Sequence, residues 1–142
     1  MLSKLDAGWF ETPLGQHLLF REQRYFDDAV SDVFGFNAVQ VGLPQIDFLR
    51  NSRIPLRVTC AVEPPAGVRA DPMFLPFENQ SLDLLLLPHV LEFSANPHQV
   101  LREAGRVLRP EGRLVLAGFN PRSLWGLART LQGGERGYPW NG

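Results

Sequence analysis

The sequence predicts an α/β fold built on a partial doubly wound parallel sheet, and two short apolar runs carry this prediction. Residues 82–87 and 113–119 are almost entirely apolar and are bounded by turn-forming residues. Runs of this length and character are typical of strands that are buried on both faces. A helical pattern at residues 97–108 separates them and is long enough for the crossover that parallel strands require. This strand–helix–strand unit therefore forms the centre of the predicted sheet.

Length and composition indicate one domain, residues 1–142, that folds without covalent cross-links. The chain is 44% hydrophobic and carries a formal net charge of −1. A domain of this size buries roughly 68–70% of its unfolded surface, so it needs neither disulfides nor a metal ion. The near-neutral charge gives no indication of a nucleic acid or an anionic membrane as partner.

The sequence lacks the signals that are typical of several functional classes. The three histidines are far apart and the single cysteine, Cys60, lies in an apolar run, so we predict no metal site and no internal disulfide. We find no apolar stretch of membrane-spanning length, no secretory signal, no phosphate-binding loop and no nucleophile elbow. We therefore expect a cytoplasmic protein.

Residues 13–33 are predicted to form a long leading helix. Thr12-Pro13 is a typical helix start, with a hydroxyl cap followed by a proline in the first turn. Apolar side chains recur at helical spacing as far as Val33, and Gly35 suits the end of the helix. The apolar stripe predicts that this helix packs against the core.

Two further strands are expected at residues 36–41 and 56–62, with a short helix at residues 45–51 between them. The five residues between Val62 and Val68 are too few for a helical crossover. Residues 68–71 are therefore expected to be an edge strand or an extended loop, which gives a sheet of about four to five strands.

The crossover helix has clear start and stop signals. Asn96-Pro97 is a cap followed by a first-turn proline, and Pro110-Glu111-Gly112 marks the stop. Four charged residues off the apolar stripe are expected to form a solvated face rather than an anion site: Arg102, Glu103, Arg106 and Arg109. A second helix is predicted within residues 120–131, followed by a tail at residues 132–142.

The segment around these strands carries a family resemblance. Leu75-Pro76-Phe77, Ser81-Leu82-Asp83 and the helix ending in Leu108-Arg109-Pro110-Glu111-Gly112 follow one another in the order found in class I S-adenosylmethionine-dependent methyltransferases. Residues 71–131 resemble the second half of such a domain, and the blocks at 88–93 and 118–127 resemble a small bacterial branch of the family. The resemblance implies a Rossmann-like methyltransferase fold over residues 36–131, with S-adenosylmethionine as cofactor.

The resemblance also implies a strand order and an incomplete sheet. The predicted strands would lie in the order 56–62, 36–41, 82–87 and 113–119. The family usually adds a C-terminal antiparallel hairpin, and nothing after residue 131 predicts one. Either the chain is a piece of a longer protein or another subunit covers the edge. An uncovered apolar edge favours association, so we expect a homodimer through the open sheet edge.

Three residues are candidate cofactor contacts, and each has a simpler alternative. Gly42 is the first glycine of an incomplete glycine-rich turn, and it fits a plain turn equally well. Glu63 falls where the family binds the ribose hydroxyls, but it precedes two prolines and fits a solvated loop acid. Asp71 falls where the family binds the adenine amino group, and it also fits a turn before Pro72.

Pro88 and His89 follow a central strand and complete the candidate site. His89 is the basic titratable group expected at that strand end, so it is a candidate general base, and the alternative is a loop histidine that helps cap residues 90–93. The predicted function is an S-adenosylmethionine-dependent methyltransferase whose acceptor the sequence does not identify. The alternative is a non-catalytic module with an interaction or regulatory role, which the broken glycine motif and the missing elements favour.

Overall fold

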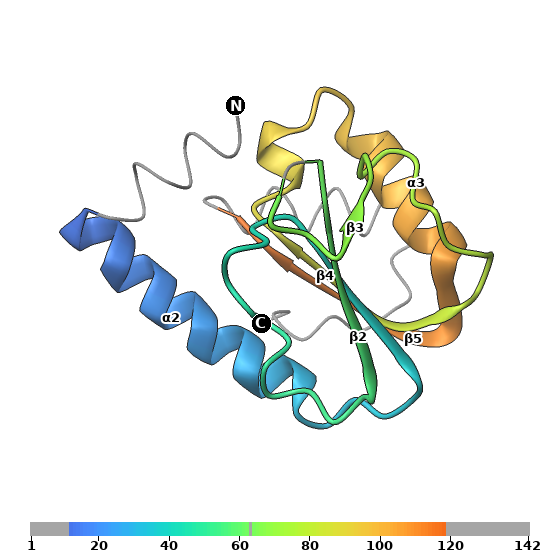
Figure 1. The fold of residues 1–142 in the computed structure, drawn as a ribbon, viewed down its shortest axis with the longest axis horizontal. Helices are drawn as coiled ribbons and strands as arrows, with labels where there is room; N and C mark the ends of the chain where they lie inside the picture. Colours follow the sequence, from blue (N-terminus) through green and yellow to red (C-terminus); the bar gives the residue numbers. More distant parts are fainter. Residues whose placement is uncertain (1–11, 63, 119–142) are drawn as a thin grey trace.

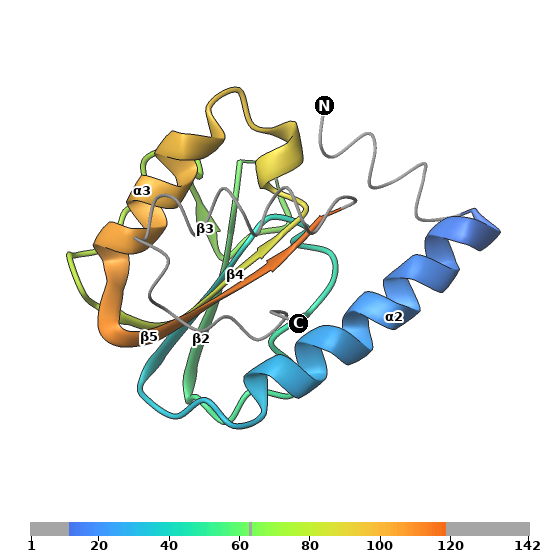
Figure 2. The ribbon, with the colours of Figure 1, turned by 180° about the vertical axis from the view of Figure 1, so that it is seen from behind.

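A computed structural model describes residues 12–62 and 64–118 (Figure 1). The described chain forms one five-stranded sheet with a helix on each face. The long helix α2 (Pro13–Val30) and the crossover helix α3 (Pro97–Val107) lie on opposite sides of the sheet, as the view from behind also shows (Figure 2). A single 3-10 turn, η1 (Leu91–Phe93), precedes α3.

All strand pairs are parallel, and the strand order is β3-β2-β1-β4-β5. This confirms the predicted α/β class and the predicted order, and of the two alternatives for residues 68–71 it shows the edge strand, over residues 68–69. The strands are β1 (Asn37–Val41), β2 (Leu56–Ala61), β3 (Val68–Arg69), β4 (Leu82–Pro88) and β5 (Leu108–Ala117).

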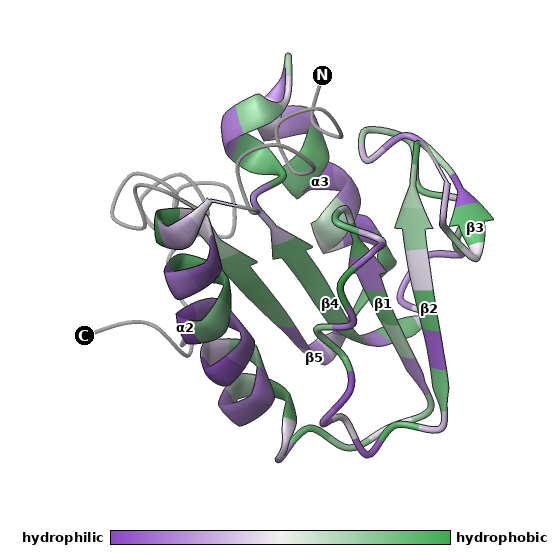
Figure 3. Ribbon diagram, turned by 60° about the vertical axis from the view of Figure 1, so that its left-hand side comes forward, coloured by the Kyte–Doolittle hydropathy of each residue, from purple (hydrophilic) through white to green (hydrophobic). Residues whose placement is uncertain are grey.

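Two hydrophobic clusters lie on the two faces of the sheet because successive side chains of a strand point to opposite sides. On one face, Val39, Leu85 and Leu114 pack with the apolar stripe of α3. On the other face, Leu84 and Val115 pack with Phe26, Ala29 and Val30 of α2. Strand β4 is accordingly apolar over most of its length, whereas α2 keeps polar residues on its outer side (Figure 3).

The helix starts are confirmed in detail. The Thr12 hydroxyl accepts a hydrogen bond from the Gly15 N–H at 3.0 Å, and the Asn96 side chain accepts one from the Gln99 N–H at 3.2 Å. Each side chain satisfies a backbone donor that the first turn of a helix leaves free. Neither described helix is long and apolar enough to cross a membrane.

Several predicted boundaries are wrong. Helix α2 ends at Val30 rather than at residue 33, and residues 45–51 form turns rather than a helix. The stop at Pro110-Glu111-Gly112 lies inside β5, where the register with β4 is irregular. Leu82 pairs with Leu108 but Leu84 pairs with Arg113, so residues 109–112 bulge out of the ladder. The predicted segments 120–131 and 132–142 lie outside the described residues.

Gly35 has a structural role that differs from the predicted helix stop. It lies four residues beyond the helix cap at Ser31, with φ of 147°, and an added Cβ would collide with the side chain of Asp83. The Asp83 carboxylate accepts hydrogen bonds from the N–H groups of Phe36 at 2.8 Å and Asn37 at 3.1 Å. The absence of a side chain at Gly35 therefore lets β4 bind the start of β1.

We predict that Leu85→Asp prevents folding. Leu85 is fully buried in β4, and an unpaired charge there costs several kcal/mol, which is comparable with the whole stability of a typical domain, about 5–15 kcal/mol. Leu56→Asp is the matched control, because Leu56 starts β2 with 56% of its surface exposed. Thermal unfolding should show a cooperative transition for the control and none for Leu85→Asp. A cooperative transition in both variants would contradict the central place of β4.

Candidate functional site

The carboxyl ends of the parallel strands bring together three of the five predicted site residues. β1 ends at Val41 and β4 ends at Pro88, so Gly42, Pro88 and His89 lie at the same edge of the sheet. A Cβ added to Gly42 would lie 3.6 Å from the carbonyl oxygen of Pro88, which shows how closely the two turns approach. Ligands of parallel α/β sheets bind at this edge.

Both the backbone conformation at position 42 and the neighbouring side chain require a glycine there. Its φ is 96°, which disfavours any residue with a side chain. An added Cβ would lie 3.0 Å from a methyl group of Val90, so the Val90 side chain fills the space above the turn. The Gly42 N–H donates to the Cys60 carbonyl at 2.8 Å. The turn alternative accounts for these facts, and contact with a cofactor stays a prediction.

A buried amide, Gln40, holds the turn that replaces the glycine-rich loop. Its Nε2 donates to the carbonyl oxygens of Gly42 and Leu43, each at 3.0 Å, and of Ile46 at 2.8 Å. Its Oε1 accepts from the Phe48 N–H at 2.9 Å. Because Gln40 is fully buried, these carbonyl groups point into the protein rather than out of the sheet edge. Sequence reasoning missed Gln40, although a polar residue inside an apolar strand was a usable signal.

Asp71 forms a turn on the loop between β3 and β4. Its Oδ1 accepts from the Met73 N–H at 2.9 Å, and its carbonyl oxygen accepts from the Phe74 N–H at 2.9 Å. This is the turn geometry that aspartate favours. Asp71 is exposed, and so is Phe74 three residues later, at 68%. The second carboxylate oxygen of Asp71 accepts no hydrogen bond from the described part of the chain, so the predicted role at adenine stays a prediction.

Glu63 is the one predicted site residue that lies outside the described residues. It directly follows Val62, just after the end of β2. Its assignment to the ribose therefore stays a prediction.

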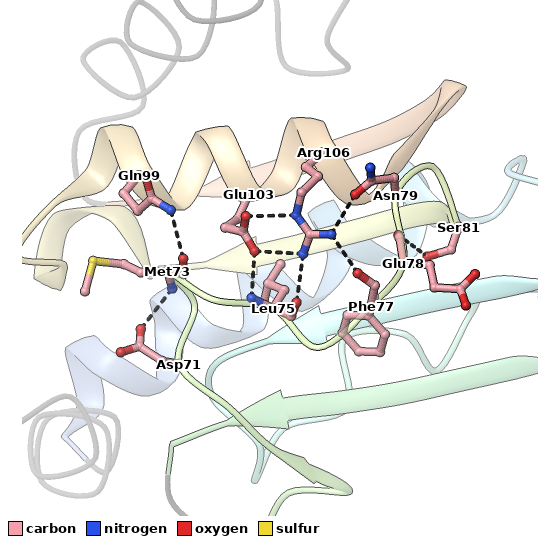
Figure 4. Close-up of polar contacts among 10 residues, drawn as sticks. All are labelled: Asp71, Met73, Leu75, Phe77, Glu78, Asn79, Ser81, Gln99, Glu103 and Arg106. Atoms are coloured by element: carbon pink, nitrogen blue, oxygen red, sulfur yellow. Dashed lines mark hydrogen bonds and ion pairs between the residues drawn. The ribbon is translucent and has the colours of Figure 1, made fainter.

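Glu103 and Arg106 do not form the solvated face that the sequence predicts (Figure 4). Arg106 donates to the carbonyl oxygens of Leu75 and Phe77, each at 2.8 Å, and to the Asn79 side chain at 2.9 Å. Glu103 pairs with Arg106 and accepts from the Leu75 N–H at 2.8 Å. The hydrogen bonds from Arg106 lower the pKa of Glu103, against the opposing effect of burial. Arg102 and Arg109 are exposed, as predicted.

His89 is enclosed by two carboxylates. Its Nδ1 lies 2.8 Å from an oxygen of Glu92 in η1, and its Nε2 lies 2.6 Å from an oxygen of Glu22 in α2. Only 2% of the His89 surface is exposed. Burial alone lowers the pKa of His89, but the hydrogen bonds and charges of Glu22 and Glu92 outweigh it and raise the pKa from 6.5 to about 9.

This environment affects both interpretations of His89. A histidine with a pKa of about 9 is protonated at neutral pH and must release that proton before it can act as a base. Its contact with Glu92 also ties it to the 3-10 turn, in the manner of the capping alternative. Glu22 is 67 residues away in sequence, so no local pattern indicated this pairing. The base role stays a prediction.

With this geometry in place, the comparisons with known proteins identify the family. Residues 24–116, more than half of the chain, match the family described as Methyltransferase domain. The chain belongs to this family. The match confirms the resemblance to class I S-adenosylmethionine-dependent methyltransferases.

One relative matches almost the whole length of this methyltransferase domain. The uncharacterized protein YafS of Escherichia coli is 33% identical over 137 residues, which is 94% of this chain but 56% of YafS. The chain thus spans little more than half the length of that relative.

Solved structures of methyltransferases show the same fold. An S-adenosylmethionine-dependent methyltransferase of Thermotoga maritima matches 92% of this chain and 80% of its own, with a TM-score of 0.66 and 17% identity. Geranyl diphosphate C-methyltransferase of Streptomyces coelicolor, solved with Mg²⁺, geranyl diphosphate and S-adenosylhomocysteine, matches 71% of this chain and 46% of its own, with a TM-score of 0.59 and 13% identity. The parallel sheet of the present domain is therefore the Rossmann-like methyltransferase sheet.

We predict that His89 makes the stability of this domain depend on pH. The pKa of about 9 in the folded state exceeds the ordinary value of 6.5, so folding stabilises the imidazolium form. This contribution, up to about 3 kcal/mol, is fully present below pH 6.5 and is lost as the pH rises through 9. Thermal unfolding from pH 6 to pH 9.5 should show the decline in the wild type and a much smaller decline in His89→Gln.

His98→Gln is the control for this experiment, because His98 is an exposed histidine in α3. It should keep the wild-type pH dependence. The readout is the slope of stability against pH rather than its level, since His89→Gln also leaves two carboxylates close together. Equal slopes in the wild type and His89→Gln would show that the Glu22–His89–Glu92 contacts do not hold in solution.

Proposed function

We propose that this domain binds S-adenosylmethionine at the carboxyl edge of its sheet and transfers the methyl group to an acceptor. The observation that carries the proposal is the family match over residues 24–116, which covers the strands that gather Gly42, Pro88 and His89 at one edge. The Streptomyces relative of the same fold holds S-adenosylhomocysteine, the product of that cofactor. The identity of the acceptor is left open by both the sequence and the fold.

The loop residues around Asp71 suit an adenine. The second carboxylate oxygen of Asp71 is an acceptor for an exocyclic amine, and the exposed ring of Phe74 on the same turn offers a flat apolar surface. In this proposal Glu63 would accept hydrogen bonds from the ribose hydroxyls, as the resemblance implies. A carboxylate acceptor of this kind contributes about 1.5–3 kcal/mol.

Polar groups of α2 suit an acceptor. When bound, S-adenosylmethionine supplies an electrophilic methyl group, and the protein contributes mainly by orienting the acceptor toward it. Two buried polar atoms of α2, the Glu22 Oε1 and the Tyr25 hydroxyl, have no hydrogen-bond partner in the described structure. Because unpaired buried polar groups are costly, they are candidates to contact a polar acceptor. His89 lies against Glu22 and holds its carboxylate in place.

A non-catalytic module with an interaction or regulatory role is the second candidate, and one observation favours it. The turn after β1 directs the carbonyl groups of Gly42 and Leu43 toward Gln40, and the Val90 side chain fills the space above Gly42. Pro44 in the same turn has no N–H to donate. The described turn thus presents few polar groups to the methionine part of the cofactor.

Calorimetric titration with S-adenosylmethionine and S-adenosylhomocysteine separates the two candidates. We expect binding with micromolar Kd if the domain is a methyltransferase, and Asp71→Asn and Glu63→Gln should each weaken it about tenfold or more. Glu78→Gln is the matched control, because Glu78 is an exposed carboxylate on the same loop and should leave the Kd unchanged. Absence of binding at millimolar ligand would favour the non-catalytic module. Wild-type affinity in both mutants would remove Asp71 and Glu63 from the site.

We also propose that two copies of the chain associate through the outer edge of β5. No described strand pairs with that edge, and β5 carries the apolar run Leu114, Val115 and Leu116. The unpaired N–H and C=O groups of an edge strand favour pairing with another chain. We propose Leu127 and Trp140, two large apolar residues that follow β5 in the sequence, as anchors of this interface, and both lie outside the described residues.

Sedimentation at micromolar concentration should show a dimer of the 16.0 kDa chain. Leu127→Asp and Trp140→Ala should weaken it, whereas Val62→Asp, an exposed position near the opposite edge of the sheet, should not. A monomer at all accessible concentrations would contradict this assembly.

A further inference from the structure

We propose that Glu103 and Arg106 of α3 are positioning residues that set the affinity of the site for adenine. They hold the loop that carries Asp71 and Phe74, although neither residue lies at the carboxyl edge itself. This inference rests on the proposed binding of S-adenosylmethionine. In this proposal α3 orders the loop before β4 in addition to connecting β4 with β5.

The loop between β3 and β4 needs partners because it lies outside the hydrogen-bond ladder of the sheet. Its backbone groups at Leu75 and Phe77 are half-buried or buried, and such groups must be satisfied. α3 supplies the partners. Glu103 accepts from the Leu75 N–H, and Arg106 donates to the Leu75 and Phe77 carbonyl groups. The middle of the loop is thus attached to the helix rather than to a strand.

All the donors of Arg106 are used in this attachment. A guanidinium has five N–H groups in a fixed planar arrangement. Arg106 makes five hydrogen bonds: two to Glu103, two to the carbonyl groups, and one to the side chain of Asn79. Glu103 holds the guanidinium in the orientation that reaches the loop (Figure 4). The side-chain exposure is 13% for Glu103 and 33% for Arg106, so this pair is only partly screened by water.

The attachment continues to the residues that would face adenine. Gln99, one turn before Glu103 on α3, donates from Nε2 to the Met73 carbonyl at 3.0 Å. The Met73 N–H in turn donates to Asp71. The loop that presents Asp71 and Phe74 is therefore held by side chains from three positions of one helix. Loss of Arg106 would remove the contacts to the Leu75 and Phe77 carbonyl groups and the partner that orients Glu103, and would leave the contacts of Gln99 and Glu103 to the loop.

Lysine is the sharpest substitution for this test. It keeps the positive charge and most of the length of arginine but has a compact ammonium with three donors, which cannot span the same set of acceptors. Arg102 offers a matched control on the same helix. It is exposed and donates to the Gln99 Oε1 at 3.0 Å, a single contact that a lysine can also make. Arg102→Lys therefore changes the same chemistry and leaves the contacts between α3 and the loop in place.

The experiment compares two ligands with the full chain. The first is S-adenosylhomocysteine, and the second is the analogue in which oxygen replaces the adenine amino group. Wild type and Arg102→Lys should prefer the adenine ligand about tenfold or more, because its exocyclic amino group donates to Asp71 whereas an exocyclic oxygen there repels the carboxylate. Arg106→Lys should lose most of this preference while keeping a cooperative thermal transition. Amide hydrogen exchange of residues 73–79 should be about tenfold faster in Arg106→Lys than in either of the other proteins.

The outcomes are distinguishable. If the wild type binds neither ligand, the proposed cofactor binding is wrong, and the positioning role falls with it. If Arg106→Lys weakens both ligands equally and keeps the wild-type preference, Arg106 is only structural and the positioning role is wrong, while cofactor binding stands. Unchanged hydrogen exchange in Arg106→Lys would also overturn the inference, because the loop would not depend on this side chain.

Discussion

Burial of β4 on both faces is the constraint on which the rest of this structure depends. Leu84 and Leu86 face the cluster of α2, whereas Leu85 and Leu87 face the cluster of α3. A strand of this kind needs a neighbouring strand on each side and a helix above and below. The chain meets these needs with β1, β5, α2 and α3. The edge at which β4 ends then becomes the place where Gly42, Pro88 and His89 meet.

The polar residues of the candidate site serve a second constraint, which is the satisfaction of buried backbone groups. The chain leaves its regular elements in the segment after β1 and in the loop between β3 and β4. In each place one planar polar group from a regular element binds several backbone groups of the irregular segment. Gln40 of β1 does this for the turn after β1, and Arg106 of α3 does it for the loop before β4. The family fold is kept, and these two side chains hold the irregular segments beside it.

The sequence predicted the fold well because its signals are local. The apolar run of β4 and the cap Asn96-Pro97 each lie within a few residues, and both were found in the structure. Apolar periodicity predicts burial more reliably than backbone conformation. Val33 is buried as predicted although α2 has already ended, and Phe48 is buried although its segment forms turns around Gln40.

The site was harder to predict because its contacts join distant parts of the chain. Arg106 lies off the apolar stripe of α3, so a helical pattern assigns it to water. Its partners Leu75 and Phe77 are 31 and 29 residues earlier in the sequence, and Glu22 is 67 residues from His89. Residue type alone therefore indicated candidates such as His89 and Asp71 but not the groups that decide their protonation or orientation.

The fit between Gly35 and Asp83 fixes the alignment of two neighbouring strands. Parallel strands can in principle slide past each other, and a shift by one residue turns every side chain to the opposite face. Here the Asp83 carboxylate occupies the space that a side chain at position 35 would need, and it binds the next two N–H groups of the chain. A slip of β1 by one residue would bring the side chain of Phe34 or Phe36 against that carboxylate. The absence of a side chain at Gly35 thus fixes the register of β1 against β4. This register keeps Val39 and Val41 on the face of α3 and Ala38 on the face of α2.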